Sequence, residues 1–181
     1  MKGNVASQKA AIAALGVGAL LLSFAAPAYA AGAGNENEPE GVKQCIIVLE
    51  PLEPGQTDSE VETRTCSTGA DFAAKSDIAA QSTLLMTWYA NSNYGGVSTQ
   101  IRGKAGPCDS SGYGFRCVGD AWNDRISSFR TFNYCNAVEE YRHANYGGIM
   151  FYLSNPGSSG LSESYLGSGS NQVSSFWLKR V

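Results

Sequence analysis

Two segments of the chain repeat one short pattern of aromatic residues and glycines, and this repeat restricts the possible folds more than any other feature. Tyr89-Ala-Asn-Ser-Asn-Tyr94-Gly-Gly96 recurs as Tyr141-Arg-His-Ala-Asn-Tyr146-Gly-Gly148. A second pair follows, because Asn123-Asp-Arg-Ile-Ser-Ser-Phe129 recurs as Ser170-Asn-Gln-Val-Ser-Ser-Phe176. From about Leu84 onward the chain is rich in aromatic residues, Gly and Ser in short alternating runs, which is typical of all-β proteins. Two copies of about 45 residues, each with four short strands, predict a two-motif β-sandwich.

The repeated segments have a simple physical interpretation. In each aromatic-x4-aromatic-x-Gly segment, the two aromatic rings can pack over a folded hairpin, and the glycine permits a turn with positive φ that other residues resist. The later segments contain Asn, Asp and Ser, whose side chains cap turns by hydrogen bonding to the backbone. The same side chains also supply the oxygen atoms that a hard cation such as Ca²⁺ prefers.

This combination resembles the microbial members of the βγ-crystallin superfamily, whose signature is an aromatic-x4-aromatic-x-Gly hairpin followed by an [Asn/Asp]-[Asn/Asp]-x-x-[Ser/Thr]-Ser calcium loop. Both hairpins match in full, and so does the first loop, Asn123-Asp124-x-x-Ser127-Ser128. The second loop departs at Ser170, where Asn or Asp is expected. The resemblance covers residues 84–181 and extends to the metalloproteinase-inhibitor and killer-toxin-like members. It implies an all-β Greek-key sandwich, with motif one at about 84–133 and motif two at about 134–181.

The resemblance also implies two Ca²⁺ sites, each with loop oxygens from one motif and a backbone carbonyl from the hairpin of the other. The residues that it implicates are Asn123, Asp124, Arg125 and Ser127 in the first loop and Asn171, Gln172 and Ser174 in the second. Asp124 is the only carboxylate in the two loops, and few charges imply weak sites, of order 10⁻⁴–10⁻³ M. Ser170 makes the second site the weaker prediction. The alternative is that both loops are turn caps that bind no metal.

Residues 1–30 have the pattern of a secretory signal peptide. Lys2 and Lys9 accompany an apolar run over 10–26, and Ala28-Tyr29-Ala30 is a small-x-small cleavage site. No other stretch approaches the ~20 apolar residues that a membrane span needs. We therefore expect a secreted, extracellular protein in an oxidising compartment, where cysteines form disulfides.

Residues 31–83 form an acidic N-terminal segment, for which we expect a disordered start, a β-hairpin and a short helix or linker at 70–81. The hairpin strands are predicted at 45–49 and 61–66. Antiparallel pairing about Gly55-Gln56 places Cys45 opposite Cys66, and facing Cα atoms in such a ladder lie within disulfide reach. The sandwich is therefore expected to follow a small disulfide-pinned appendage.

The remaining cysteines, Cys108, Cys117 and Cys135, permit one disulfide and one leftover thiol. A Cys108–Cys135 bond would tie an inserted loop to the junction between the motifs, whereas Cys108–Cys117 would close a short glycine-rich hairpin. We slightly favour the first pairing because it restrains the longer loop.

Composition excludes most enzyme classes that are recognisable from sequence. His143 is the only histidine, so a zinc site built on two or three histidines is impossible. There is no phosphate-binding G-x-x-x-x-G-K-[ST] loop and no H-E-x-x-H motif. Glu139 and Glu140 are adjacent, so on a strand they point to opposite faces and make poor acid/base partners. Residues 83–181 lack the strongly basic character of a nucleic-acid-binding surface.

We therefore expect a monomeric, non-enzymatic calcium-binding module in which Ca²⁺ is structural. One alternative is a proteinaceous inhibitor of secreted metalloproteases that presents the loop 103–118. The other is a killer-toxin-like or cell-surface-binding protein, whose partner would be a cell-surface glycan. The tryptophans are expected to pack in the core or at strand edges, with an aromatic sugar-binding platform as the second interpretation; they are Trp88, Trp122 and Trp177.

Overall fold

The computed structural model describes residues 44–67 and 80–181. The predicted signal peptide at 1–30, the predicted disordered start of the acidic segment and most of the helix or linker predicted at 70–81 lie outside these residues. Within the described part of the chain, no helix is long and apolar enough to cross a membrane.

The described residues form ten strands and two single-turn 3₁₀ helices. The strands are β1 (Gln44–Leu49), β2 (Val61–Ser67), β3 (Thr83–Asn91), β4 (Gly95–Gly103), β5 (Tyr113–Phe115), β6 (Ser128–Thr131), β7 (Ala137–His143), β8 (Gly147–Ser154), β9 (Ser162–Glu163) and β10 (Ser175–Lys179). The 3₁₀ helices are η2 (Ser92–Tyr94) and η3 (Gly167–Gly169). The predicted all-β class is confirmed.

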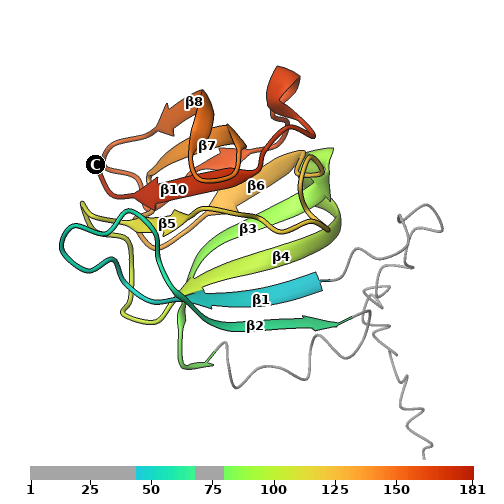
Figure 1. Cartoon of the computed structure of the whole chain (residues 1–181). Helices are drawn as coiled ribbons and strands as arrows, with labels where there is room; N and C mark the ends of the chain where they lie inside the picture. The colour runs from blue at the N-terminus through green and yellow to red at the C-terminus, as the bar shows by residue number, and fades with distance from the viewer. Residues whose placement is uncertain (1–43, 68–79) are drawn as a thin grey trace, which may run out of the picture. The chain divides into compact units, whose positions relative to one another are not determined.

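The strands form two sheets, a six-stranded one in the order β2-β1-β4-β3-β6-β9 and a four-stranded one in the order β5-β10-β7-β8 (Figure 1). In each repeat the first, second and fourth strands stay in one sheet, while the short third strand joins the sheet of the other repeat. β5 of the first repeat pairs with β10, and β9 of the second repeat pairs with β6. This exchange completes two Greek-key motifs, as the βγ-crystallin resemblance implied.

Large aromatic side chains fill the space between the sheets. Trp88 on β3 is fully buried and stacks on Phe176 of β10, with ring centroids 5.5 Å apart. Trp122 meets Trp88 edge to face, with ring centroids 5.9 Å apart, and the ring centroid of Phe115 lies 5.8 Å from that of Trp88. Aromatic pairs of this kind stabilise a core beyond the area that they bury. The prediction that Trp88 and Trp122 pack in the core is therefore confirmed, whereas Trp177 is only partly buried.

The N-terminal hairpin pairs in the predicted register. Cys45 faces Cys66 across β1 and β2, their Cα atoms lie 4.1 Å apart, and the two residues form a disulfide. The register shifts by one residue only between Val48 and Leu49. The hairpin is more than an appendage, however, because β1 runs parallel to β4 and continues the six-stranded sheet. Its side chains from Cys45 to Leu49 are buried, and those of Cys45, Ile47 and Leu49 belong to the hydrophobic core.

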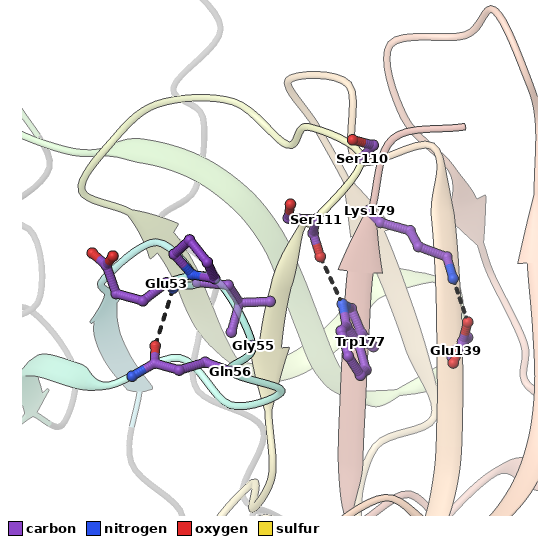
Figure 2. Close-up of a pocket in the computed structure, with 10 residues that line it drawn as sticks. Glu53, Gly55, Gln56, Ser110, Ser111, Glu139, Trp177 and Lys179 are labelled. Atoms are coloured by element: carbon purple, nitrogen blue, oxygen red, sulfur yellow. Dashed lines mark hydrogen bonds and ion pairs between the residues drawn. The ribbon is translucent and has the colours of Figure 1, made fainter.

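The turn between β1 and β2 reaches the other sheet. The Asp58 carboxylate accepts a hydrogen bond from the Tyr146 hydroxyl at 2.9 Å and pairs with the Arg116 guanidinium at 3.2 Å. The Ser59 N–H donates to the Gly114 carbonyl on β5 at 2.9 Å. Residues 53–56 consequently lie near Trp177 and Lys179 of β10, as Figure 2 shows.

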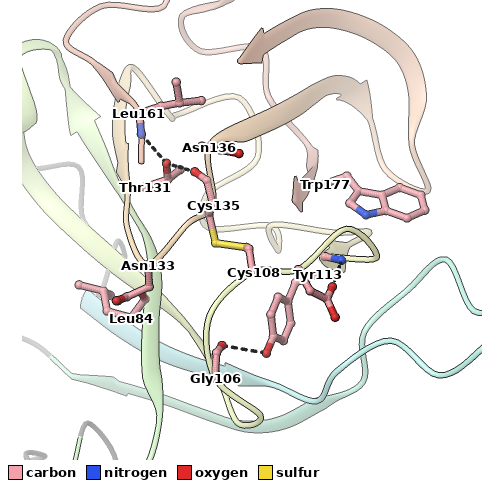
Figure 3. The surroundings of a disulfide bond; sticks show 12 residues. Leu84, Gly106, Cys108, Tyr113, Thr131, Asn133, Cys135, Asn136, Leu161 and Trp177 are labelled. Carbon is pink, nitrogen blue, oxygen red and sulfur yellow. Dashed lines mark hydrogen bonds between the residues drawn. A yellow bond between two sulfur atoms is a disulfide. The ribbon is translucent and has the colours of Figure 1, made fainter. Parts of the chain in front are cut away.

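The second disulfide joins Cys108 to Cys135, the pairing that the sequence slightly favoured (Figure 3). It ties the β4–β5 loop to the segment between the motifs, where the Cys108 N–H also donates to the Asn133 carbonyl at 3.0 Å. Cys117 is the leftover cysteine and is exposed.

Candidate metal-binding loops

The last serine of each repeated loop holds the hairpin of its own motif. The Ser128 hydroxyl donates to the Asn91 carbonyl at 2.6 Å and accepts from the Tyr94 N–H at 3.1 Å. Ser175 makes the same two bonds, to the His143 carbonyl at 2.7 Å and from the Tyr146 N–H at 3.2 Å. Because both hydroxyls are fully buried and engaged, these serines are structural and leave the other loop oxygens as candidate ligands.

The two hairpins have the same unusual backbone. Asn93, Tyr94 and Gly96 have φ of 56°, 62° and 73°, and the equivalent residues of the second repeat have φ of 56°, 59° and 64°. The paired tyrosine rings meet edge to face in both hairpins, with centroids 5.7 Å and 5.5 Å apart. The packing of aromatic rings over a turn with positive φ is therefore confirmed in each copy. His143 is the last residue of β7, at the second hairpin, and is exposed.

The two loops lie against each other through reciprocal backbone bonds. The Asp124 N–H donates to the Val173 carbonyl at 3.4 Å, and the Asn171 N–H donates to the Ile126 carbonyl at 2.9 Å. Asp124 and Asn171 occupy matching places in the repeat and share a left-handed backbone, with φ of 57° and 59°. Asp124 therefore lies beside Val173, the residue before Ser174 in the second loop. Asn171 lies beside Ile126, the residue before Ser127 in the first loop.

Side-chain oxygens consequently meet across the loops. The Ser127 hydroxyl donates to Asn171 Oδ1 at 3.0 Å, which joins a residue of the first loop to one of the second. Within the first loop, the Asn123 amide donates to Asp124 Oδ2 at 2.9 Å. Ser174 instead donates to the Arg142 carbonyl at 2.7 Å, and the Gln172 amide donates to the Ser168 carbonyl at 2.7 Å. Arg125 is half-buried beside these groups.

The oxygens differ in their access to solvent. Asn123, Asp124 and Asn171 are exposed, whereas the side chains of Ser127 and Ser174 are buried at the base of the loops. Asp124 supplies the only carboxylate of the two loops. Within residues 44–67 and 80–181, no three His, Cys, Asp or Glu side chains gather as a potential metal site. Any cation held here would depend on amide, hydroxyl and carbonyl oxygens with a single charged donor.

The sequence did not predict that the two loops contact each other through a side-chain hydrogen bond. We grouped Asp124 with Ser127 and Asn171 with Ser174 because they are neighbours in the chain. The equal spacing within the two repeats was a usable signal, since two copies that pack face to face bring matching residues together in reciprocal pairs.

Comparison with known proteins gives no match to a family model and none to a curated protein. Among solved structures, a βγ-crystallin from an archaeon is 24% identical and covers 53% of this chain and 98% of its own, with a TM-score of 0.38. A βγ-crystallin domain from Flavobacterium johnsoniae is 22% identical and covers 53% of this chain and 94% of its own, with a TM-score of 0.37. A double mutant of a domain from Clostridium beijerinckii is 20% identical, covers 54% and 98%, and has a TM-score of 0.40. Nothing in these matches supports kinship with protease inhibitors or killer toxins.

Proposed function

We propose that this chain, whose two interlocked Greek-key motifs have the βγ-crystallin fold, binds Ca²⁺ weakly at its paired loops and uses the ion to stabilise that fold. The residues that would hold the ion are those predicted from the sequence: Asn123, Asp124, Arg125, Ser127, Asn171, Gln172 and Ser174. The observation that carries the proposal is the contact of Ser127 with Asn171, which brings two oxygen donors together from different motifs.

The donor set suits Ca²⁺ better than a transition metal. Ca²⁺ takes six to eight oxygen ligands in flexible geometry, and amide, hydroxyl, carbonyl and carboxylate groups all qualify. The loops offer no thiolate or imidazole, the ligands that zinc and copper favour. Because Asp124 supplies the only negatively charged oxygen of the loops, the sites are weak and would be filled at the millimolar calcium of an extracellular medium.

The expected role of the ion follows from the position of the loops. Each loop leads directly into the last strand of its motif, β6 or β10, and contacts the loop of the other motif. An ion bound there would join the two motifs in the folded state only, and such an ion stabilises that state by mass action. This role requires no catalytic group, and the βγ-crystallin fold is typically non-enzymatic. The two disulfides are consistent with an extracellular protein.

Calcium is expected to raise the thermal midpoint of the protein. At ~100 times the dissociation constant, one site adds about 2.7 kcal/mol to the free energy of unfolding. For a chain of this size, that corresponds to roughly 5–10 °C. The measurement is thermal unfolding in several millimolar Ca²⁺ and in excess EDTA, repeated at higher calcium if the first shift is small. Equal midpoints at every calcium concentration would show that the loops act as turn caps alone.

The substitution Asp124→Ala is expected to weaken the tighter calcium site at least about tenfold, which corresponds to ~1.4 kcal/mol of binding free energy. The substitution removes the only charged oxygen of the loops, while the backbone bonds of the loop remain. The measurement is calorimetric titration with Ca²⁺. Asp120→Ala is the matched control, because Asp120 is also an exposed carboxylate in the preceding turn but lies outside the predicted ligand set. Identical affinities for the two variants would contradict the assignment of Asp124.

A further inference from the structure

A pocket of about 450 Å³ lies on the outer face of the four-stranded sheet, away from the paired loops (Figure 2). Trp177 and Lys179 of β10 and Glu139 of β7 form its floor. The β1–β2 turn, including Gln56, and Ser111 of the β4–β5 loop form its walls. Pockets of this size accommodate small organic ligands, and they usually combine apolar surface with a few fixed polar groups.

The indole of Trp177 is held in place at the pocket. Its Nε1–H donates to the Ser111 carbonyl at 3.0 Å, and its ring packs against Tyr146 with centroids 5.6 Å apart. Trp177 is the only one of the three tryptophans that is not fully buried. An aromatic ring that is fixed and still accessible offers a flat apolar surface at little cost in side-chain entropy.

The charged groups of the floor neutralise each other. Lys179 Nζ donates to Glu139 Oε1 at 2.5 Å, and the Tyr141 hydroxyl donates to Glu139 Oε2. Burial opposes the charge on Glu139, but these hydrogen bonds lower the pKa of Glu139 below its usual value. The Glu139 carboxylate therefore stays ionised at neutral pH. Paired with the ammonium of Lys179, it presents both an acceptor and a donor, with no net charge. A charged ligand would have to compete with this pair, whereas a neutral ligand could hydrogen-bond to both partners.

The walls of the pocket are also fixed before any ligand arrives. The Gln56 N–H donates to the Glu53 carbonyl at 2.9 Å, and the Glu53 N–H donates to Gln56 Oε1 at 3.1 Å, so the tip of the turn is closed on itself. Two residues further on, Asp58 is bound to Tyr146 and Arg116. A ligand that enters would not have to order this segment, and preorganisation of this kind favours binding.

We propose that this pocket binds a neutral saccharide, with one face of a sugar ring stacked on Trp177 and its hydroxyl groups hydrogen-bonded to Glu139, Lys179 and the serine loop. A sugar ring has an apolar C–H face and a rim of hydroxyl groups that both donate and accept. These features match an indole surface beside a neutralised carboxylate–ammonium pair. Purely apolar ligands would displace water from these polar groups and leave their remaining hydrogen-bonding capacity unused, which is unfavourable.

The test uses three neutral disaccharides as probes: cellobiose, maltose and N,N′-diacetylchitobiose. Binding is followed by titration calorimetry and by tryptophan fluorescence, in which Trp177 is the responsive residue because Trp88 and Trp122 are buried. At least one disaccharide is expected to bind with a millimolar or lower dissociation constant. Trp177→Ala is expected to weaken that binding at least about tenfold, equivalent to ~1.4 kcal/mol.

Two further variants separate loss of the site from loss of the fold. Ser110→Phe places a ring in the pocket from an exposed position, so it should abolish binding with an unchanged thermal midpoint. Tyr165→Ala removes an exposed aromatic ring outside the pocket, one more accessible than Trp177, and should leave binding unchanged. Binding should also persist in EDTA, because the pocket and the calcium loops are separate. The proposal is overturned if none of the disaccharides binds, if binding survives Ser110→Phe, or if only a charged sugar such as digalacturonic acid binds.

Discussion

Replacement of Glu140 by glutamine is expected to stabilise the protein at neutral and alkaline pH and to leave its stability at pH 4 nearly unchanged. Glu140 on β7 is fully buried, and neither of its carboxylate oxygens has a hydrogen-bond partner among the described residues. Its cross-strand neighbours are Phe176 on β10 and Phe151 on β8. Burial, assisted by the negative charge of Glu163, raises the pKa of Glu140 to about 8.

The sign of the pH dependence follows from this shift. Between pH 4.5 and about 8, Glu140 is protonated in the folded state and ionised in the unfolded state. The folded state therefore binds more protons than the unfolded state. As a result, the free energy of unfolding falls as pH rises, by about 1.4 kcal/mol per pH unit. Below pH 4.5 Glu140 is protonated in both states and does not lower the free energy of unfolding. Above about pH 8 it is ionised in both states, and its destabilising effect no longer changes with pH.

The measurement is urea unfolding of wild type and Glu140→Gln at intervals from pH 4 to pH 9. The free-energy difference between the two proteins should be near zero at pH 4 and grow to several kcal/mol by pH 8. Glu140→Met, which matches the apolar neighbours, should be at least as stable as the glutamine variant. Glu60→Gln is the control, because Glu60 is exposed and its substitution should give a curve parallel to that of wild type. Parallel curves for Glu140→Gln as well would show that the buried carboxyl is not protonated.

The substitution Gly112→Ala is expected to destabilise the protein by about 3–5 kcal/mol, near the upper end of the range for single substitutions. Gly112 has φ of +75°, where a residue with a Cβ is strained by ~1–2 kcal/mol. An added Cβ would also lie only 2.0 Å from the Leu178 carbonyl oxygen, which belongs to the backbone of β10. Because a backbone oxygen cannot rotate away, β5 and β10 would have to separate.

The matched control for this substitution is Gly157→Ala. Gly157 has a similar φ of +85°, but an added Cβ would meet nothing within 4 Å. The decrease in the free energy of unfolding caused by Gly157→Ala should therefore be limited to the backbone strain, about 1–2 kcal/mol. The measurement is the free energy of unfolding in guanidinium chloride for both variants. Equal losses would contradict the steric part of the argument.

Local patterns in the sequence predicted the local structure well. The hairpin turns, their positive φ values and their paired tyrosines follow from neighbouring residues, because a glycine and two aromatic rings within eight positions interact directly. The Cys45–Cys66 disulfide could be predicted equally well, since the register of a hairpin is fixed by its turn and places one known residue opposite another. Glu139 and Glu140 point to opposite faces of β7, as expected for adjacent residues on a strand.

The environment of those residues could not be predicted in the same way. Alternation along β7 separates Glu139 from Glu140, but it does not say which of the two faces the core. The structure places Glu140 between two phenylalanines of neighbouring strands and Glu139 beside Lys179 and Tyr141. These neighbours come from segments up to 40 positions apart, so no local pattern records them.

The sequence by itself determined the all-β class, the two repeated motifs, the first disulfide and the candidate oxygen donors, because each depends on residues that are close in the chain or repeated along it. Only the tertiary structure decided that β1 joins the six-stranded sheet, that β5 and β9 exchange between motifs, and that Ser127 meets Asn171. The pocket beside Trp177 also exists only because the β1–β2 turn crosses to the second sheet. The physical reason is that alternation fixes which face a side chain takes, whereas the partner on that face is selected by packing between distant strands.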